Sequence, residues 1–143
     1  MKIALTNNHP KRRISRPYLE KKIKKIIQIL GDSKKVLSLL LTTDKKIAAL
    51  NKTFLKKIGP TDVLSFPFNS DEIFGEIVIS LDTAAKQARQ YGLGLHEQCL
   101  VLIIHGMLHL QGFDHDTQKK EKIMRQKEKI LMQVILGKIV PYL

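Results

Sequence analysis

The amino-acid sequence predicts an α+β fold in which one sheet of about four strands packs against about five helices. Two observations support this prediction. Strand-like and helix-like segments follow one another along the chain, and the segment from Cys99 to Ile104 is apolar on every side. A helix that is apolar all round is buried, so the helix containing this segment is expected in the core. At 143 residues the chain is expected to form a single domain, residues 1–143.

The first part of the chain is predicted to contain two strands, each followed by a helix. Residues 2–7 form the first strand, and Pro17 marks the start of a helix that runs to about Gly31. Residues 36–43 form the second strand, and Asp44 is the predicted N-cap of the next helix. The expected apolar faces of the two helices are Leu19, Ile23, Ile26, Ile27 and Leu30, and Ile47, Leu50 and Phe54.

The second part of the chain is predicted to contain two strands and three helices. The stretch of residues 62–68 is apolar and β-rich and is expected to form a strand that ends at Pro67. Residues 73–80 form another strand. The strands at 36–43 and 73–80 need a crossover between them, which favours a single sheet packed on helices. Helices are predicted over residues 82–91, 97–111 and 117–137. The inner stripe of the last helix is expected to be Ile123, Ile130, Leu131, Val134 and Ile135.

The chain carries a formal net charge of +12, and its basic residues gather in two groups. An excess of this size predicts association with polyanions. The alternative is a solvated, lysine-rich surface without a partner. The first group is Lys11, Arg12, Arg13, Arg16, Lys21, Lys22, Lys24 and Lys25, and the second is Lys119, Lys120, Lys122, Arg125, Lys127 and Lys129.

Cysteine content and hydropathy predict a cytoplasmic protein that does not use a membrane. The one cysteine, Cys99, has no partner for an intrachain disulfide, which fits a reducing compartment. Its apolar surroundings favour an inert, buried thiol. No apolar run approaches the roughly 18 residues that a membrane span requires, and residues 1–8 do not resemble a signal peptide.

Three histidines with metal-ligand spacing lie in the stretch His105-Gly-Met-Leu-His109-Leu-Gln-Gly112-Phe-Asp-His115. On a helix, His105 and His109 share one face. Gly112 is expected to end the helix in the left-handed conformation, so that the chain folds back and presents His115. Three imidazoles with one open position are typical of a catalytic zinc site. A lone buried histidine would usually be structural, but this pattern predicts one divalent metal ion, with zinc preferred.

Gly106 argues against ordinary peptide hydrolysis. Zinc peptidases with a related histidine pattern carry a glutamate directly after the first histidine, and this glutamate is the general base. Here that position is glycine. A basic chain with a hydrolytic metal centre points instead to nucleic acid.

The stretch from His105 to His115 closely resembles the YbeY family of bacterial proteins. Two further stretches agree with that family: Pro60–Pro67, which reads Pro-Thr-Asp-Val-Leu-Ser-Phe-Pro, and Gly75–Ser80, which reads Gly-Glu-Ile-Val-Ile-Ser. The pair Leu50-Asn51 also matches, and length and motif order extend the resemblance over the whole chain. The resemblance implies a zincin-like fold with a four-stranded sheet beside the ligand helix. It also implies zinc or a similar metal on His105, His109 and His115.

The same resemblance implies the activity and the partners. The expected function is that of a metal-dependent single-strand endoribonuclease that matures the 3′ end of small-subunit rRNA and takes part in ribosome quality control. The expected partners are single-stranded or ribosomal RNA and the ribosome or its proteins. Family members usually carry arginine just after the aromatic residue that follows Leu-Asn, whereas here Leu55 follows Phe54. Lys56 and Lys57 are then the candidates to contact phosphate, although lysine does not replace a bidentate arginine.

The expected nucleophile is a metal-bound water, whose pKa the metal lowers from 15.7 toward about 7, or else the RNA 2′-hydroxyl. No general base is evident. Asp114 is a candidate base, but such a carboxylate more often orients a ligand imidazole or caps a turn. Thr61 and Ser65 are candidate cleft residues by resemblance, with strand and turn structure as the alternative role.

Two alternative functions remain open at this point. One is a metallopeptidase-like hydrolase on the same scaffold. The other is a non-catalytic RNA- or ribosome-binding factor with a structural metal, which Leu55 favours.

Overall fold

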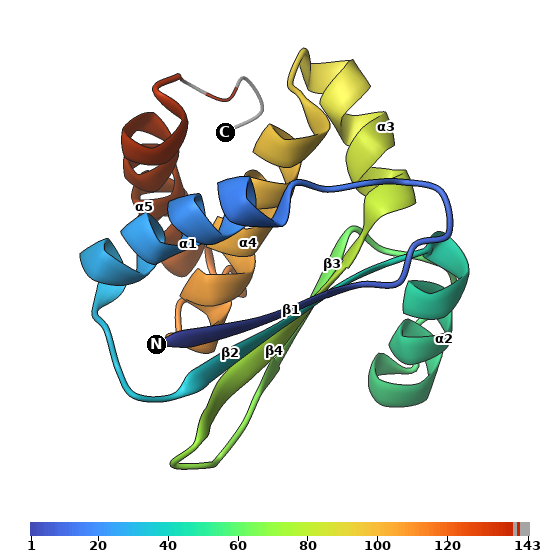
Figure 1. The fold of residues 1–143 in the computed structure, drawn as a ribbon. Coiled ribbons are helices and arrows are strands. Elements are labelled where there is room, and N and C mark those ends of the chain that lie inside the picture. The colour runs from blue at the N-terminus through green and yellow to red at the C-terminus, as the bar shows by residue number, and fades with distance from the viewer. Residues whose placement is uncertain (139, 141–143) are drawn as a thin grey trace.

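The computed structural model describes residues 1–138 and 140, and over these residues it contains four strands and five helices. The strands are β1 (Lys2–Asn7), β2 (Val36–Thr42), β3 (Val63–Pro67) and β4 (Ile73–Ser80). The helices are α1 (Arg16–Leu30), α2 (Asp44–Leu55), α3 (Leu81–Tyr91), α4 (Leu95–Leu110) and α5 (Gln118–Leu136). The predicted α+β class, with one sheet and a buried ligand helix, is confirmed (Figure 1).

The four strands form one mixed sheet in the order β1-β2-β4-β3. The first three run parallel, with Leu5 opposite Leu39 and Leu39 opposite Ile77. The edge strand β3 runs antiparallel to β4 and places Ser65 opposite Ile77. Parallel neighbours require crossover connections, and α1 supplies the one between β1 and β2. The antiparallel strand β3 forms one edge of the sheet, and α4 packs against this strand.

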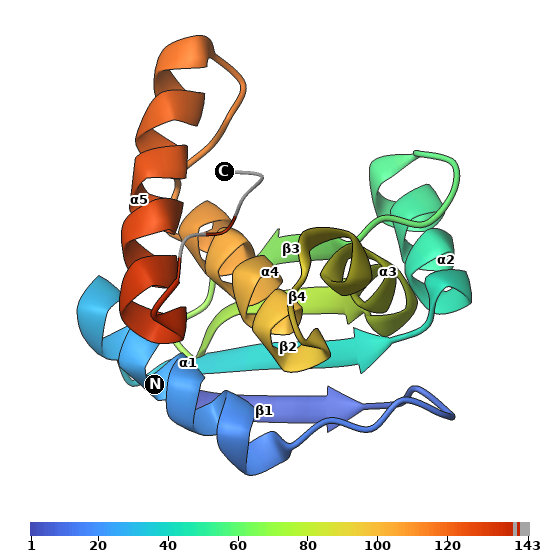
Figure 2. The same cartoon turned by 90° about the horizontal axis from the view of Figure 1, so that it is seen from above.

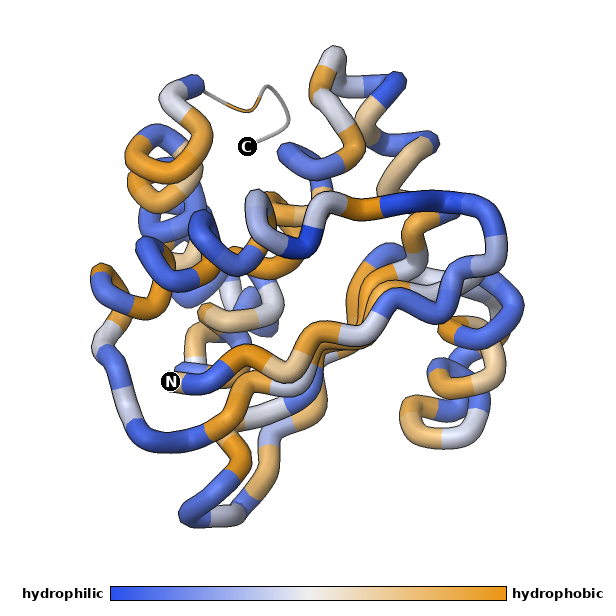
Figure 3. The backbone as a smooth tube through the Cα atoms, viewed as in Figure 1, coloured by the Kyte–Doolittle hydropathy of each residue, from blue (hydrophilic) through white to orange (hydrophobic). Residues whose placement is uncertain are grey.

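Helices cover both faces of the sheet. In β4, Ile77 and Ile79 face the main core, which includes buried residues of α1, α4 and α5, whereas Val78 faces the other way, toward Ile47 of α2 and Leu64 of β3. This alternation follows from the two-residue period of a strand. Figures 1 and 2 show α1, α4 and α5 on one side of the sheet and α2 on the other, and Figure 3 shows hydrophobic residues on the surfaces where they meet.

Helix α4 is the centre of the main core. Every residue from Gln98 to Ile104 is buried, as its apolar sequence predicts. Cys99 is among them, and burial raises the pKa of its thiol to about 12. Within the described residues, no single helix has the length and hydrophobicity to cross a membrane, and α3 and α4 meet these criteria only when taken together across a bend of 109°.

The N-cap predicted for the second helix was wrong by one residue. Thr43 caps α2, because its hydroxyl accepts a hydrogen bond from the Lys46 amide. Asp44 is the first helical residue, and its carboxylate accepts hydrogen bonds from the hydroxyls of Ser80 and Thr83. Asp44 thereby ties α2 to the junction of β4 and α3.

The stripe predicted for α5 was also wrong for three of its five residues. Ile123, Ile130 and Val134 are exposed. The residues that α5 buries are Met124, Glu128, Leu131, Met132 and Ile135. Both sets have helical spacing, and the predicted set was the one with branched apolar side chains. Helix α5 is rotated so that Met124, Glu128 and Met132 face the core. The contact between Glu128 and His105, described below, accounts for this orientation.

The two basic groups lie on neighbouring helices. The first occupies the loop after β1 and α1, and the second occupies α5. These helices lie side by side (Figures 1 and 2), and Lys22 Nζ donates to the carbonyl of Ile135 across them. This contact joins α1 to the C-terminal end of α5, whereas the basic residues of α5 lie in its N-terminal two thirds.

Candidate metal centre

His105 and His109 lie one above the other at the C-terminal end of α4. Their Nε2 atoms are 3.1 Å apart and their ring centroids 4.6 Å apart. A tetrahedral zinc ion with bonds of about 2.0–2.1 Å places two ligand nitrogens roughly 3.4 Å from each other. The spacing of four residues, set by the helical repeat, therefore puts two ligand atoms at a distance that suits one metal ion.

Gly112 turns the chain back after α4 through a two-bond helix C-cap. The Gly112 amide donates to the carbonyl of His109, and the Phe113 amide donates to the carbonyl of Leu108. Gly112 has a φ of 100°, which residues with a side chain rarely adopt. The return brings His115 to the other two histidines, so that the three ligand atoms lie within 4.8 Å of one another. The predicted convergence of the three rings is confirmed.

Glu128 of α5 lies directly behind His105. The Nδ1–H of His105 donates to Oε1 of Glu128 at 3.1 Å, and the glutamate side chain is only 7% exposed. A carboxylate in this position fixes the tautomer of the ring and leaves Nε2 as the free lone pair. Glu128 was not among the residues predicted from the sequence. The available signal was a glutamate within the apolar repeat Met124, Leu131 and Ile135.

His109 is prepared to bind a metal rather than a proton. Burial lowers the pKa of His109, and the nearby rings of His105 and His115 lower it further. The charge of Asp114 and a backbone hydrogen bond at Phe113 act in the opposite direction, but they are smaller. A neutral imidazole is the form that coordinates metals. The donor set of three imidazole nitrogens, with the Glu128 carboxylate behind His105, fits a divalent cation.

Asp114 lies on the surface in the turn before His115. Its Oδ1 accepts a hydrogen bond from the His115 amide at 2.7 Å, and this bond is the main cause of its lowered pKa. The observed contact is that of a turn-stabilising carboxylate. Its role as a general base stays a prediction.

Gly106 lies where α4 packs against the sheet. A Cβ atom at this position would be 2.9 Å from the Ser65 hydroxyl and 3.0 Å from the Ile77 side chain. Ser65 also donates to the Gly106 carbonyl at 3.4 Å. A glutamate, which the peptidase pattern requires here, would not fit without moving the helix or the strands.

Two cavities meet at the histidines. One, the β3-side cavity, has a volume of about 470 Å³ and is lined by residues of α2, β3 and α4, together with His105, His109 and His115. The other, the α5-side cavity, has a volume of about 320 Å³ and lies between α3, α4 and α5. Asp62, His105 and His115 line both cavities. The two cavities therefore adjoin at the metal centre.

Three of the four predicted substrate-binding residues line the β3-side cavity. These are Lys57, Thr61 and Ser65. Lys56 is not among the lining residues, and it takes the left-handed C-cap position of α2 with a φ of 55°. Leu55 does line the cavity and is 47% exposed. The position after Phe54, where the resemblance led us to expect arginine, is therefore at the site.

Comparison with known proteins identifies similar chains throughout bacteria. The chain matches the family described as Endoribonuclease YbeY over residues 4–135. It is 42% identical to the Endoribonuclease YbeY of Aquifex aeolicus over 127 residues, which cover 85% of each chain. It is 41% identical to that of Carboxydothermus hydrogenoformans over 103 residues, which cover 70% of this chain and 72% of the relative. The solution structure of TM1509 from Thermotoga maritima matches with a TM-score of 0.66 and 29% identity, covering 94% of this chain and 89% of that one.

Proposed function

Since the chain belongs to the YbeY family of endoribonucleases, we propose that it cleaves single-stranded RNA with the help of one divalent metal ion held by His105, His109 and His115. The function is that of a metal-dependent endoribonuclease in rRNA processing. Its expected substrate is the 3′ end of small-subunit rRNA, and it also acts in ribosome quality control.

The observation that carries this proposal is the arrangement of ring nitrogens. The Nε2 atoms of His105 and His109 face each other at 3.1 Å, and Glu128 already occupies the other ring nitrogen of His105. Neutral ring nitrogens are acceptors on one side, and two facing acceptors need a cation or a proton between them. Imidazole ligands in a set of three favour zinc, with an open position for substrate.

The residues around the histidines hold and orient the substrate. A bound divalent ion would supply Lewis acidity at a phosphoryl oxygen and a lower pKa for water. Lys57 lines the β3-side cavity, where its ammonium group is placed to neutralise a phosphate. The hydroxyls of Thr61 and Ser65 line the same wall and can donate to phosphate or ribose oxygens. Asp114 is proposed, at lower priority, as the proton acceptor.

The proposed partners and location follow from charge and chemistry. The net charge of +12 and the basic groups of α1 and α5 fit a ribosomal particle, whose surface is rich in phosphate. We place the protein in the cytoplasm, where ribosomes are assembled and where the lone thiol of Cys99 stays reduced.

Leu55 favours a second candidate, a non-catalytic RNA-binding factor that keeps a structural metal. In place of a bidentate arginine the cavity has an aliphatic side chain, which gives no directed contact to phosphate. This candidate predicts RNA binding without cleavage in the presence of metal.

A cleavage assay separates the two candidates. The protein, purified without a histidine tag, is loaded with zinc or manganese and incubated with single-stranded RNA from the 3′ end of small-subunit rRNA precursors. The proposal expects cleavage that His109→Ala abolishes while RNA affinity stays close to that of the wild type. Binding without cleavage in both proteins would support the second candidate. A casein-like unstructured peptide serves as the control substrate, and its hydrolysis would support a peptidase.

A further inference from the structure

The α5-side cavity has a wall of side-chain amides beside the metal centre. Gln87 of α3 and Gln98 of α4 both line it, as do His105 and His115. The same cavity is also lined by the apolar side chains of Val101 and Leu102 on α4 and Met124 on α5. Cavities lined by apolar side chains and a few directed polar groups are typical of sites for small organic groups.

A chain of three hydrogen-bonding groups fixes the orientation of the two amides. Gln87 Nε2 donates to Oδ2 of Asp62 at 3.1 Å, and Gln98 Nε2 donates to Oε1 of Gln87 at 2.9 Å. An amide can usually be flipped without a visible difference. Here the carboxylate of Asp62 can only accept, so Gln87 must direct its nitrogen to Asp62 and its oxygen to Gln98. The group that Gln98 has left over is therefore its carbonyl oxygen.

This oxygen has no hydrogen-bond partner within the part of the chain that the structure describes. Gln98 is 1% exposed, and its Oε1 is buried and unpaired. Buried polar atoms are almost always paired, and one that is not needs a reason. Gln98 is a lining residue of the α5-side cavity, so a ligand in that cavity that brings an N–H group to the buried oxygen would satisfy it.

The carboxylates of the cavity already have partners, which argues against a cationic ligand. Glu128 accepts from His105, and Glu121 pairs with Arg125 at 2.8 Å. Asp62 accepts from Gln87 and from the Val63 amide. The ligand that fits is neutral and flat, with an N–H group at its edge.

We propose that the α5-side cavity binds one nucleobase of the RNA, next to the phosphodiester at the metal centre, and that Gln98 recognises it by accepting a hydrogen bond from a base amino or ring N–H group. This inference rests on the proposed function, because it requires RNA at the histidines. Unpaired bases of single-stranded RNA are read by hydrogen bonds to their edges while their faces lie on apolar or aromatic side chains. The side chains of Val101, Leu102 and Met124 provide the apolar surface, and Gln98 the reading group.

Affinity measurements with abasic RNA test the proposal. A series of short single-stranded RNAs carries one abasic nucleotide, moved step by step along the strand relative to the cleavage site. Binding is measured in the His109→Ala background, because His109 does not line the α5-side cavity and its loss prevents cleavage. Removal of the base at one position next to the cleavage site is expected to weaken binding roughly three- to tenfold, the value of one hydrogen bond.

A substitution then assigns this effect to Gln98. In the Gln98→Leu background the abasic penalty is expected to shrink, because the acceptor is gone while the apolar contacts with Val101, Leu102 and Met124 remain. Gln126→Leu is the matched control, since Gln126 is an exposed amide on the outer side of α5. The control is expected to keep the full penalty. Cleavage of RNA with randomised sequence should likewise lose its preference at that one position in Gln98→Leu only.

The outcomes separate this inference from the proposed function. An RNA that is cleaved but shows no abasic penalty at any position overturns the base site and leaves the endoribonuclease intact. An equal penalty in Gln98→Leu and Gln126→Leu also overturns it. If Gln98→Leu does not fold, the abasic series in the Gln98-containing protein still decides. Absence of cleavage by the metal-loaded wild type contradicts the proposed function, while the binding series still judges the base site.

Discussion

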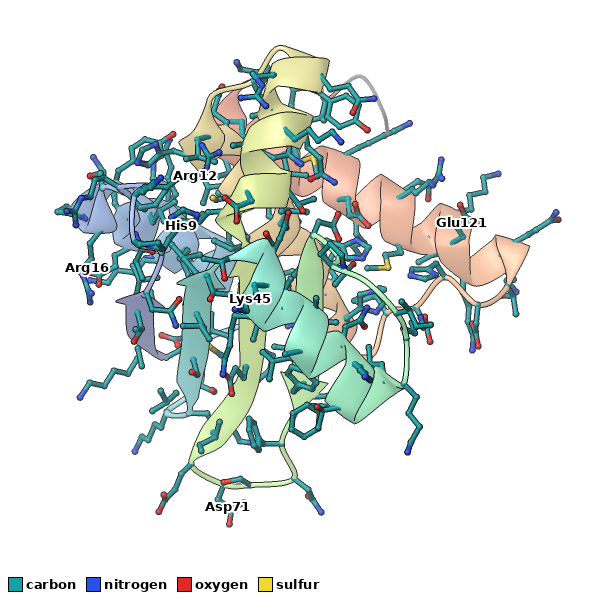
Figure 4. The ribbon with its side chains drawn as sticks, turned by 90° about the vertical axis from the view of Figure 1, so that its right-hand side faces the viewer. His9, Arg12, Arg16, Lys45, Asp71 and Glu121 are labelled. Atoms are coloured by element: carbon teal, nitrogen blue, oxygen red, sulfur yellow. The ribbon has the colours of Figure 1, made fainter. Side chains whose placement is uncertain are left out.

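The molecule holds histidines in two contrasting settings. Around His9, every polar atom of the ring has a partner: Nδ1 accepts from the amides of Lys11 and Arg12, and Nε2 donates to Oδ1 of Asp82 at 2.8 Å. Asp82 in turn accepts from Arg12 Nε and from the Asp44 amide. We call these four residues, the side chains of His9, Arg12 and Asp82 with the amide of Asp44, the His9 cluster. Figure 4 shows His9 and Arg12 close together and far from Glu121 on α5.

The metal cluster, formed by His105, His109 and His115, is open where the His9 cluster is closed. Two of its rings direct the same kind of atom at each other, and two cavities end at it. Hydrogen bonds therefore hold the His9 cluster together within the protein, whereas the metal cluster is completed by something outside the chain. The difference separates a histidine whose ring is satisfied within the fold from histidines available to a ligand, although His9, His105 and His109 are all partly buried.

The largest expected effect comes from removing a ring of the metal cluster. His109→Ala should eliminate metal binding and lower RNA cleavage by more than the roughly 100-fold seen when a carboxylate behind a ligand is lost. Metal content by mass spectrometry and single-turnover cleavage measure this. His9→Ala is the matched control and should retain one metal per chain. RNA cleavage by His109→Ala at the wild-type rate would show that the metal cluster, like the His9 cluster, is not needed for catalysis.

Loss of the carboxylate behind the metal cluster should have the next largest effect. In Glu128→Gln the His105 ring is no longer held by a charged acceptor, so metal affinity or activity should fall about 10- to 100-fold. Competition with a chelating dye measures the affinity. Glu20→Gln on α1 changes the same chemistry away from the site and should leave the affinity as it is. Equal metal affinities in the wild type, Glu128→Gln and Glu20→Gln would show that Glu128 contributes only to packing.

The His9 cluster should respond in stability and not in catalysis. His9→Ala leaves Asp82 with fewer donors, and it should lower the free energy of unfolding by about 1–3 kcal/mol. Denaturant unfolding measures this, with metal-free protein used throughout. A loss of RNA cleavage without a loss of stability would contradict the assignment of His9 to the fold.

The pH dependence of this stability has a definite sign. Burial by itself would raise the pKa of Asp82, but hydrogen bonds from the Asp44 amide, His9 and Arg12 hold it below its ordinary value. A carboxyl group of this kind stabilises the fold above the unfolded-state pKa of about 3.9, and the contribution is lost as the pH falls through the lower, folded-state pKa. The stability gap between wild type and Asp82→Asn should therefore close below about pH 4. Asp71→Asn, at the tip of the β3–β4 hairpin (Figure 4), should show no such gap.

The smallest expected effect lies at the rim of the metal cluster. Leu55→Arg places a guanidinium at the β3-side cavity, and it should add about one phosphate contact. The plot of log RNA affinity against log salt should then steepen by about 0.7. Ile58→Arg adds the same charge at a residue that is 98% exposed and does not line the cavity, and it should change the slope less.

Much of the fold was predictable because its signals are local. The strands, the helix start at Pro17 and the buried α4 follow from periodicity, proline and apolar composition over short stretches. The buried stripe of α5 could not be predicted in this way. Met124 and Ile130 lie on different faces of the helix, and the apolar residues of each face have helical spacing. The face that turns inward is set by a tertiary partner, because Glu128 on that face pairs with His105 of α4.

The same limit applies to the candidate site. The three histidines and the turn at Gly112 were predictable because ligand spacing and a helix-ending glycine are written within eleven residues. Glu128 and the pair Gln87 and Gln98 come from other helices, so their meeting depends on the packing of α3, α4 and α5. Asp44 and His9 show the same in the fold, since both reach partners more than thirty residues away.

The central claim is that the metal cluster holds one divalent ion on which RNA cleavage depends. The most direct measurement follows metal content and cleavage of single-stranded RNA in one preparation, as untagged protein is stripped with a chelator and titrated with zinc or manganese. The account predicts that cleavage disappears on stripping and returns in proportion to metal, reaching its maximum at one equivalent per chain. Undiminished cleavage by the stripped protein, or a bound metal that survives His109→Ala, would contradict it.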